Sequence, residues 1–590
     1  MAEFKKVVIT TKGQALIAKL MSGAGTVEFT KMAVSSTVYT DAQLVGLTAL
    51  AAIKQNAPIS KVLRTNNVAV QVEAAITNDD LAVGYHMQTL GLFARDPQEG
   101  EILYAVTNAA VAGYMPPFNG KTPSGAFFTM VTTVGNADNV NITINPSAYA
   151  TIGNVTDLQG QIDNLEAYIG YQDDEILGLE VDFTRSKFTR LAGAVNRTPG
   201  LSFDNVEPFG GRRRCILTDN GKVLAYHGQV GYTETGKLTQ AIVIGEGETA
   251  VTYPIGTIVQ VMVEQPKFYY KVVPLKLDKV ENGKGFHLRK ARYYVSGKHK
   301  AGFKLHPAFV RNGKEKNVIY LSAYEGAIYD ESAGAYILDD AQVADFATDK
   351  LSSISGTKPA SGLTQNLTRA NTRKLAQNRG LGWEQSYGAT VAATQLLFAI
   401  EYASFNTQTA IGMGVVKTDD GATTMAEPTG ATTLLGNKSG KTDNGSVTYR
   451  GEENFWMNIY KWVDGLNIEA KGLNNLYVAD NGFADDIGTT PYKDAGITLA
   501  KANGYISAFA YNESFDWLFF ASETTGSSAL PVGDYHYQLN TAAGWLAALF
   551  GGDWNNGTYG GGFCWAVHYA ASTRNRALGG RLVYVPNVVA

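Results

Sequence analysis

The 590-residue sequence contains only two cysteines, Cys215 and Cys564, which excludes a scaffold held together by disulfides. No apolar run approaches the roughly 18 residues that a membrane-spanning helix requires. The N-terminus, MAEFKKVVITTKGQ, has a brief and soon interrupted apolar stretch, so no signal peptide is expected. The formal net charge is only −4, which gives no global attraction to nucleic acid or to anionic membranes. We therefore expect a protein that folds in a cytoplasm and acts outside the cell only within an assembly or after lysis.

Glycine and tyrosine, by contrast, are abundant. The chain holds 63 glycines and 31 tyrosines, with 45% hydrophobic and 18% charged residues, a composition typical of folded domains with many strands and turns. It is also too long to be organised around one hydrophobic core. The expected fold class is α+β, β-rich and multidomain.

Residues 1–150 are predicted to form a small α+β domain. A strand is expected over residues 5–11 and a short amphipathic helix over residues 13–21. Alternating apolar residues predict further strands over residues 68–73 and 139–145, the second ended by Pro146.

Residues 151–185 show the clearest periodicity of the chain and predict a coiled-coil trimerisation segment. β-Branched residues at the first core position with leucine at the second formally favour a dimer, whereas the polar Gln172 and the resemblance described below favour a trimer. The alternative is an amphipathic helix packed on its own domain, and glycines at 160, 170 and 178 weaken any helix here. The apolar positions with 3–4 spacing are Val155, Leu158, Ile162, Leu165, Ile169, Ile176, Leu179 and Phe183.

Residues 186–265 are predicted to be a separate β-rich domain, with a turn at residues 218–221. Its basic run, Arg212-Arg213-Arg214, is interpreted as a solvated loop or an anion contact. Residues 267–316 hold 14 Lys or Arg against 3 Asp or Glu. We expect these to lie on solvated strand faces, the alternative being binding of nucleic acid or acidic polysaccharide. Helices are predicted over residues 364–378 and 389–403, and a loop over residues 418–447.

In the last forty residues, glycines and tryptophans are spaced as in a rigid frame, and the residues between them have apolar, polar, charged and aromatic side chains. Aromatic residues supply large contact area at low entropic cost, and Asn, Ser and Gly supply adaptable hydrogen bonds. This pattern favours recognition over catalysis.

Two stretches near the N-terminus, VITTKGQAL at residues 8–16 and FTKMAV at residues 29–34, resemble the N-terminal domain of bacteriophage tail-collar and tail-fibre proteins. The resemblance implies that residues 1–150 attach the protein to the baseplate or tail.

Residues 266–590 resemble the C-type-lectin-like fold, in the branch shared with formylglycine-generating enzymes. The sequence GGDWNN at residues 551–556 matches the "GGxWNN" element of that branch, and NR at 575–576 with GGRLV at 579–583 matches its closing "NR…GxRL" strand. Within the branch, the sequence is similar to the variable proteins of diversity-generating retroelements, which include phage receptor-binding tail proteins.

The resemblance implies a hypervariable receptor-binding face, because in those systems mutagenesis of adenines converts asparagine codons into codons for many other amino acids. The alternative is a lectin-like loop of fixed sequence, which makes the same surface a ligand site. Trp554, Trp565 and Arg581 are expected to be scaffold, and Cys564 could instead be a small buried hydrophobic residue. Eight positions are compatible with such diversification, and Asn555 and Asn556 complete the predicted face: Asp553, Tyr559, Cys564, Ala566, His568, Tyr569, Thr573 and Ala577.

No cofactor or metal is expected. Glu427-Pro428-Thr429 departs from the Glu-Pro-Asn loop of calcium-dependent lectins, and His568 has no metal-ligand spacing around it. The cysteine pair that the oxidising relatives need is missing from residues 266–590, so the chain is not expected to be an enzyme. Asp534 with His536 is a pair that is common by chance, and Glu452-Glu453 could form half of a glycosidase site.

These patterns together predict a homotrimeric phage tail-tip or tail-fibre protein, carried in the virion, that binds a protein or glycan receptor on the host surface. A tail-associated glycan hydrolase and a structural baseplate subunit are the alternatives. Neither nucleic acid nor membrane insertion is expected.

Overall fold

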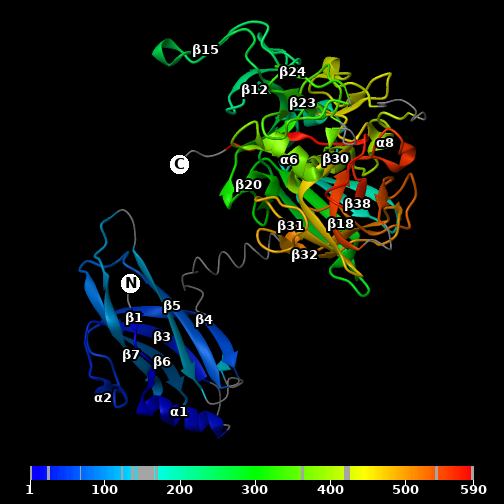
Figure 1. The fold of residues 1–590 in the computed structure, drawn as a ribbon. Coiled ribbons are helices and arrows are strands. Elements are labelled where there is room, and N and C mark those ends of the chain that lie inside the picture. The colour runs from blue at the N-terminus through cyan, green and yellow to red at the C-terminus, as the bar shows by residue number, and fades with distance from the viewer. Residues whose placement is uncertain are drawn as a thin grey trace. The chain divides into compact units, whose positions relative to one another are not determined.

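The computed structural model describes residues 3–22, 27–66, 68–120, 124–134, 140–141, 165, 170–339, 341–360, 365–417, 426–538 and 543–586. The chain divides into two compact units, Met1–Ile162 and Asp163–Ala590, which Figure 1 shows as a ribbon. Strands predominate, at 41% of residues against 13% in helices, as expected for a β-rich chain. No helix among the described residues has the length and apolar content needed to cross a bilayer.

The first unit is built on one nine-stranded sheet with the order β1-β7-β6-β3-β4-β5-β8, in which β2 also pairs with β7 and β9 with β3. The Thr10 hydroxyl caps helix α1 by accepting the Gly13 N–H at 3.1 Å, and Leu16 and Leu20 anchor the helix in the core. Of the strand expected over residues 139–145, β9 is observed and residues 142–145 lie outside the described residues. The elements are β1 (Glu3–Phe4), β2 (Val8–Ile9), α1 (Thr11–Met21), β3 (Val27–Ser35), α2 (Asp41–Leu44), β4 (Ile53–Asn66), β5 (Ala69–Thr77), β6 (Tyr85–Asp96), β7 (Gly100–Met115), β8 (Gly125–Thr133) and β9 (Val140–Asn141).

The second unit contains three larger sheets around a buried helix. Its first half comprises β10 (Leu177–Asp182), β11 (Lys187–Ala192), α4 (Glu207–Gly210), β12 (Arg213–Leu217), β13 (Val223–Tyr226), β14 (Ile242–Ile244), β15 (Val251–Tyr253), β16 (Gln260–Pro266), β17 (Tyr269–Lys279), β18 (Phe286–Ser296), β19 (Lys304–Leu305), β20 (Val310–Arg311), β21 (Lys314–Glu315), β22 (Val318–Ser322), β23 (Ala327–Asp330), β24 (Ala335–Tyr336), β25 (Lys350–Ser352), α6 (Arg369–Gln377), β26 (Trp383–Gln385) and α7 (Gly388–Tyr402).

The second half continues with α8 (Thr407–Ala410), β27 (Gly440–Lys441), β28 (Val447–Tyr449), β29 (Glu452–Glu453), β30 (Tyr460–Ala470), β31 (Asn474–Val478), β32 (Lys493–Thr498), β33 (Gly504–Tyr505), β34 (Ala508–Tyr511), β35 (Ala521–Glu523), β36 (Tyr535–Tyr537), β37 (Gly544–Phe550), β38 (Trp565–Tyr569), β39 (Leu578–Gly579) and β40 (Leu582–Tyr584). Short 3-10 helices include η4 (Pro307–Phe309), η6 (Glu513–Phe515) and η7 (Gly557–Tyr559).

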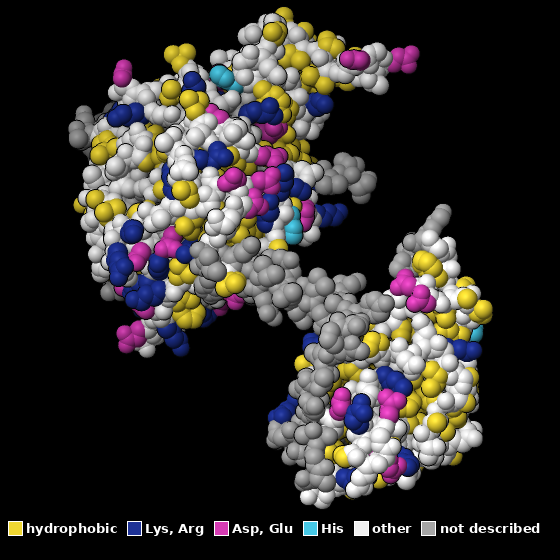
Figure 2. Space-filling model, turned by 180° about the vertical axis from the view of Figure 1, so that it is seen from behind, with side chains coloured by type: hydrophobic (Ala, Val, Ile, Leu, Met, Phe, Trp, Pro, Cys, Tyr) yellow, Lys and Arg dark blue, Asp and Glu magenta, His cyan; other side chains and the backbone are white. Residues whose placement is uncertain are grey.

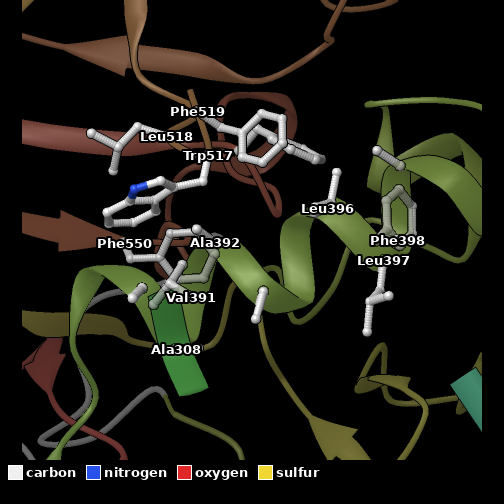
Figure 3. Close-up of a cluster of buried hydrophobic side chains, with 14 of the residues drawn as sticks. Ala308, Val391, Ala392, Leu396, Leu397, Phe398, Trp517, Leu518, Phe519 and Phe550 are labelled. Atoms are coloured by element: carbon white, nitrogen blue, oxygen red, sulfur yellow. The ribbon is translucent and has the colours of Figure 1, made fainter. Parts of the chain in front are cut away.

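The three sheets bring together segments that are far apart in the sequence. One has the order β13-β12-β16-β22-β40-β26, a second β11-β10-β18-β17-β19 with β34 and β35 attached, and the third β32-β31-β30-β37-β38-β36-β33. Helix α7 is buried along nearly its whole length, so apolar residues occupy all of its sides rather than one stripe. Figure 3 shows its side chains projecting in different directions, with Val391 and Ala392 beside Trp517.

Several buried charged side chains of the second unit form ion pairs. Glu401 accepts hydrogen bonds from Arg450 Nε at 2.6 Å and Nη2 at 2.7 Å. Asp464 accepts from Arg373 Nε at 2.9 Å and Nη2 at 2.6 Å. Because a buried charge without a partner is strongly destabilising, these pairs constrain how the sheets pack.

Two predictions about domain organisation were wrong. Residues 177–182, placed in the coiled coil, form strand β10, which pairs with β11 and β18. Leu177, Leu179 and Val181 are fully buried in the main core. These apolar residues repeat at every second position, as expected for a strand, within the segment in which Ile176, Leu179 and Phe183 follow the 3–4 spacing of a coiled coil. The remaining coiled-coil positions before residue 170 lie outside the described residues, except residue 165.

The division at residue 265 is likewise absent. Strand β16 pairs with β12 on one side and with β22 on the other, and β22 pairs with β40 near the C-terminus. Residues 186–265 therefore share a sheet with the end of the chain instead of forming a separate domain.

Several local predictions were confirmed. Helix α7 begins and ends one residue before its expected limits, a common discrepancy at helix ends. Helix α6 ends one residue early and begins five residues later than expected. The turn at residues 218–221 joins β12 and β13, with Gly221 at φ +79° and its N–H bonded to the Thr218 carbonyl at 2.9 Å.

Of the two basic segments, only the first differs from expectation. Arg212 and Arg214 are 1% and 0% exposed, so the run is not a solvated loop: Arg212 pairs with Glu452, and Arg214 donates to the Gly451 carbonyl and to Tyr324. In the lysine-rich segment, Arg289 bridges Asp278 and Glu523, and other basic residues pair with Asp173, Glu180 and Asp516. Basic and acidic side chains accordingly lie interspersed on the surface that Figure 2 shows.

Candidate functional site

The C-terminal segment enters the third sheet as its strand β38. This strand is antiparallel to β37 and parallel to β36, with Tyr537 opposite Ala566, and β36 pairs in turn with β33, with Tyr505 opposite Tyr535. Alternation along the strands sends Trp565 and Val567 into the main core, while Cys564 and Ala566 point to the other side of the sheet.

A row of aromatic side chains covers the edge of the sheet formed by β33, β36 and β38. We call it the tyrosine face: Tyr505, Tyr535, Tyr537, Tyr559, His568 and Tyr569. Every member is partly or largely exposed, Tyr559 the most at 44%.

Each ring of the tyrosine face contacts at least one other, so that the six rings form a continuous series. Tyr535 lies 5.1 Å from Tyr505, 4.7 Å from Tyr559 and 4.8 Å from Tyr537, measured between ring centroids. Tyr537 lies 6.3 Å from His568, which lies 4.0 Å from Tyr569. Contacts at these distances fix the rings relative to one another, so the face is a preorganised aromatic surface.

The loop at residues 551–560 borders this face. Asp553 accepts the Asn555 N–H at 2.9 Å, and Asn556 accepts the Asp553 N–H at 3.0 Å. The Asn556 side chain also donates to the Tyr537 hydroxyl at 3.4 Å, which joins the loop to the aromatic row. Asn555 is exposed, whereas Asp553 and Asn556 are partly buried.

Two glycines make this loop possible. Gly551 and Gly552 have φ of +94° and +86°, a region that residues with a side chain rarely adopt. A Cβ on Gly552 would also lie 2.8 Å from the Gly560 Cα. The glycines therefore set the loop conformation and leave its other residues to make contacts.

Charge on the face is small at neutral pH. Burial raises the pKa of Asp553 to about 6, against the opposing effects of the Asn555 N–H and of Lys461. Burial lowers the pKa of His568, so its imidazole is neutral at pH 7. The surface thus offers ring faces, hydroxyls, amides and one carboxylate.

Three of the predicted contact residues are not at the surface, and their assignment was wrong. Cys564, Ala566 and Ala577 are 0%, 1% and 6% exposed. Cys564 and Ala566 belong to a small core beneath the face with Tyr460 and Leu549, and burial raises the pKa of the Cys564 thiol. Ala577 packs beside Trp554 in another small cluster. A pattern of interchangeable residue types does not reveal which of them point inward.

The other predicted positions lie where solvent reaches them. Asp553, Asn555, Asn556, Tyr559, His568, Tyr569 and Thr573 are partly or fully exposed. Those assigned to the scaffold, Trp554, Trp565 and Arg581, are 4%, 1% and 3% exposed. The Trp565 indole N–H donates to the Phe519 carbonyl at 3.0 Å, and the Arg581 guanidinium donates to the Ser322 carbonyl at 2.7 Å.

Sequence reasoning missed half of the tyrosine face. Tyr505, Tyr535 and Tyr537 lie outside the terminal forty residues to which the predicted face was confined. Tyr535-His536-Tyr537 did carry a usable signal, because residues two apart on a strand point to one side. No local sequence pattern predicts that β33 pairs with β36.

The candidate catalytic residues are engaged in packing. His536 is fully buried, its pKa lowered to about 4, and its Nε2 lies 3.1 Å from the Ala500 carbonyl. Asp534 is also fully buried and accepts the Phe563 N–H at 2.6 Å. Glu452 pairs with Arg212, and Glu453 accepts the N–H groups of Gly430 and Thr432 at 2.7 and 2.6 Å. The cavity beside Glu452 measures about 10 Å³, which is too small for a sugar. Within the described ranges, no group of three or more His, Cys, Asp or Glu residues is arranged to hold a metal ion.

No family model matches the chain, and no curated protein matches its sequence. Among solved structures, the chain is similar to the Major Tropism Determinant U1 variant, with 12% identity over 68% of this chain and 93% of that chain and a TM-score of 0.24. The I1 variant matches at 11% identity, 68% and 93% coverage and a TM-score of 0.24, and the P3c variant at 10%, 67% and 88%, and 0.24. TM-scores this low support no conclusion about fold or function.

Proposed function

We propose that this chain is a receptor-binding protein of a phage tail, and that the tyrosine face with the loop at residues 551–560 contacts the host surface receptor. One observation carries the proposal. Six partly exposed aromatic side chains form a contiguous, mutually packed surface at one sheet edge, bordered by a loop that offers exposed and partly exposed Asn and Asp groups.

Such a surface suits binding for two physical reasons. Tyrosine side chains bury much area while losing few rotatable bonds, and rings already held by their neighbours lose little further entropy. The small core of Tyr460, Leu549, Cys564 and Ala566 beneath the face supports it from below. Affinity is then determined by the exposed groups while the sheet keeps its shape.

The remaining parts of the proposal derive from sequence. The terminal motifs suggest a C-type-lectin-like fold for the part of the chain that contains them, and diversification of the surface positions among residues 553–573. The N-terminal motifs suggest attachment of residues 1–150 to the tail or baseplate. A homotrimer would present three such faces, and several weak contacts on one virion raise avidity by orders of magnitude.

The decisive experiment replaces Tyr559 by alanine in the virion and measures the adsorption rate on permissive cells. Tyr559 is 44% exposed, so the variant should fold normally, yet it removes the most accessible ring of the face. We expect adsorption to fall at least about tenfold, as is common for a central aromatic contact. Tyr269→Ala, at a partly exposed tyrosine of strand β17 in another sheet, is the matched control and should adsorb normally.

The result also separates the alternatives. Normal adsorption of the Tyr559→Ala virion would contradict the proposal, and a failure of assembly with the same variant would favour a structural baseplate subunit. A glycan hydrolase requires two accessible carboxylates, whereas Glu452 and Glu453 are 3% and 1% exposed and hydrogen-bonded. Loss of host polysaccharide on incubation with the purified chain would support that alternative.

A further inference from the structure

The third sheet carries a cavity at its other edge, away from the tyrosine face. Strands β32 and β31 lie at one end of the sheet, and β36 and β33 at the other. The cavity measures about 580 Å³ and is bounded by these first two strands, by η4 and η6 and by the start of α7. Its size falls within the range of pockets that bind small ligands, about 300–1,000 Å³.

The indole of Trp517 lines this cavity with an unused hydrogen-bond donor. Trp517 is 5% exposed, yet its Nε1–H has no acceptor among the residues that the structure describes. Other buried tryptophans do have one: Trp456 donates to Gly412 and Trp565 to Phe519, each at 3.0 Å. The Trp517 N–H is not sealed off from solvent, and the cavity that Trp517 lines is where an acceptor from outside the chain would lie.

The indole is held firmly in place. Figure 3 shows it beside Val391 and Ala392 of α7, and its ring lies 6.2 Å from the buried His306 ring. Phe515, partly exposed, lies 6.4 Å from Trp517 with its ring tilted by 48°. The donor is therefore preorganised, and a second ring lies next to it.

Further polar groups of the lining are fixed by short-range bonds. Asn512 Oδ1 accepts the Ser514 N–H at 3.0 Å, and its Nδ2 donates to the Gly496 carbonyl at 3.4 Å. Asp480 accepts from Asn481 at 2.5 Å through Oδ1, and no described residue bonds its Oδ2. The lining thus offers a carboxylate acceptor and an amide as well as the indole donor.

The charge of the lining points to a neutral ligand. Asp480 and Asp494 are accompanied by Lys493, and Asp494 forms an ion pair with Lys284. The rest is apolar, with Val478, Pro307 and Pro491 among the walls. Scattered donors and acceptors between apolar and aromatic surfaces suit a molecule with hydroxyl groups along its edge and C–H groups on its faces.

We propose that this cavity is a saccharide-binding site, in which Trp517 Nε1 donates to a sugar oxygen, Asp480 accepts from a hydroxyl, and Phe515 lies against a C–H face of the ring. The site is distinct from the tyrosine face and does not depend on it. It would give the chain a second contact with a glycan-coated surface.

The test uses the full chain and free monosaccharides: D-glucose, D-galactose, D-mannose, N-acetyl-D-glucosamine, L-rhamnose and L-fucose. Saturation-transfer difference NMR detects binding, and titration gives the dissociation constant. We expect transfer to at least one sugar, with a dissociation constant raised about fivefold or more in both Trp517→Phe and Asp480→Asn. Trp517→Phe removes the hydrogen-bond donor, and Asp480→Asn replaces a charged acceptor by a weaker neutral one.

The controls make the outcome decisive. Trp517→Phe keeps an aromatic ring but changes the core, whereas Asp480→Asn changes a partly exposed group and is expected to preserve the fold. Tyr559→Ala should bind the sugar as the unaltered chain does. The proposal is overturned if none of these sugars shows transfer, if Asp480→Asn binds with unchanged affinity, or if Tyr559→Ala abolishes sugar binding. Loss of adsorption in Tyr559→Ala with sugar binding retained separates this site from the receptor-binding proposal.

Discussion

Tyr505 and Tyr535 lie opposite each other across the antiparallel pair of β33 and β36, with ring centroids 5.1 Å apart and ring planes at 87°. Edge-to-face pairs of this kind contribute about 0.5–1.5 kcal/mol beyond the burial of their area. The double variant Tyr505→Ala/Tyr535→Ala should therefore lose that much less stability than the sum of the two single variants. Urea denaturation of the four proteins measures the coupling, and additive losses would show that the two rings do not support each other.

Cys564 should not react in the folded protein. Both Cys564 and Cys215 are fully buried, and burial raises the pKa of each thiol. Since the thiolate is the reactive form, Ellman's reagent should label neither cysteine in the native chain and both after unfolding in guanidinium. Rapid labelling of the native protein that persists in a Cys215→Ala variant would place Cys564 on the surface, as the sequence pattern suggested.

Acidification should destabilise the second unit through His306. This residue is fully buried, and burial lowers its pKa to about 3, so the folded state binds a proton less readily than the unfolded state. Stability from this residue is present at neutral pH and falls as the pH drops below about 6.5, by about 2 kcal/mol at pH 5.

His306→Asn removes this titration while keeping an acceptor for the Ala308 N–H, which His306 Nδ1 accepts at 3.3 Å. The free energy of unfolding of this variant should decrease by about 2 kcal/mol less than that of the unaltered chain between pH 7 and pH 5. His299→Asn, at an exposed histidine, is the control and should follow the unaltered chain. Equal pH dependence in all three proteins would contradict the prediction.

Glu401→Gln should be strongly destabilising. Glu401 is fully buried and accepts from Arg450, from the Tyr449 hydroxyl at 3.0 Å and from the Gly200 N–H at 2.9 Å. The substitution removes the buried counter-ion of Arg450 and leaves only the half-exposed Asp204 carboxylate, 2.9 Å from Arg450 Nη1. We expect the free energy of unfolding to fall by about 3 kcal/mol, the lower end of the loss typical for a broken buried ion pair.

Glu469→Gln provides the matched comparison for this buried pair. Glu469 pairs with the exposed Lys471 at 2.7 Å, and an exposed ion pair contributes about 1 kcal/mol or less. Similar losses in the two variants would mean that the Glu401–Arg450 pair is more solvated than its burial indicates. Thermal and urea denaturation of both variants give the comparison.

The sequence by itself determined the local features of this protein. Glycine and β-rich patterning predicted the strand content, Asn220-Gly221 predicted the β12–β13 turn, and the apolar run near residue 396 predicted helix α7. The glycines at 551 and 552 belong to the rigid frame that the sequence indicated, and both have positive φ values in the structure. These features depend on interactions between neighbouring residues, which a single sequence displays.

Only the tertiary structure decided how the strands pair. Ile176, Leu179 and Phe183 fit a heptad, whereas Leu177, Leu179 and Val181 fit a strand, and only the pairing of this segment with β11 and β18 distinguishes the two. Cys564 and Ala566 are buried because β38 lies between β36 and β37, and Tyr505 joins Tyr535 across thirty residues for the same reason. Strand pairing depends on backbone groups that every residue carries, so side chains along one segment do not specify which distant segment it will meet.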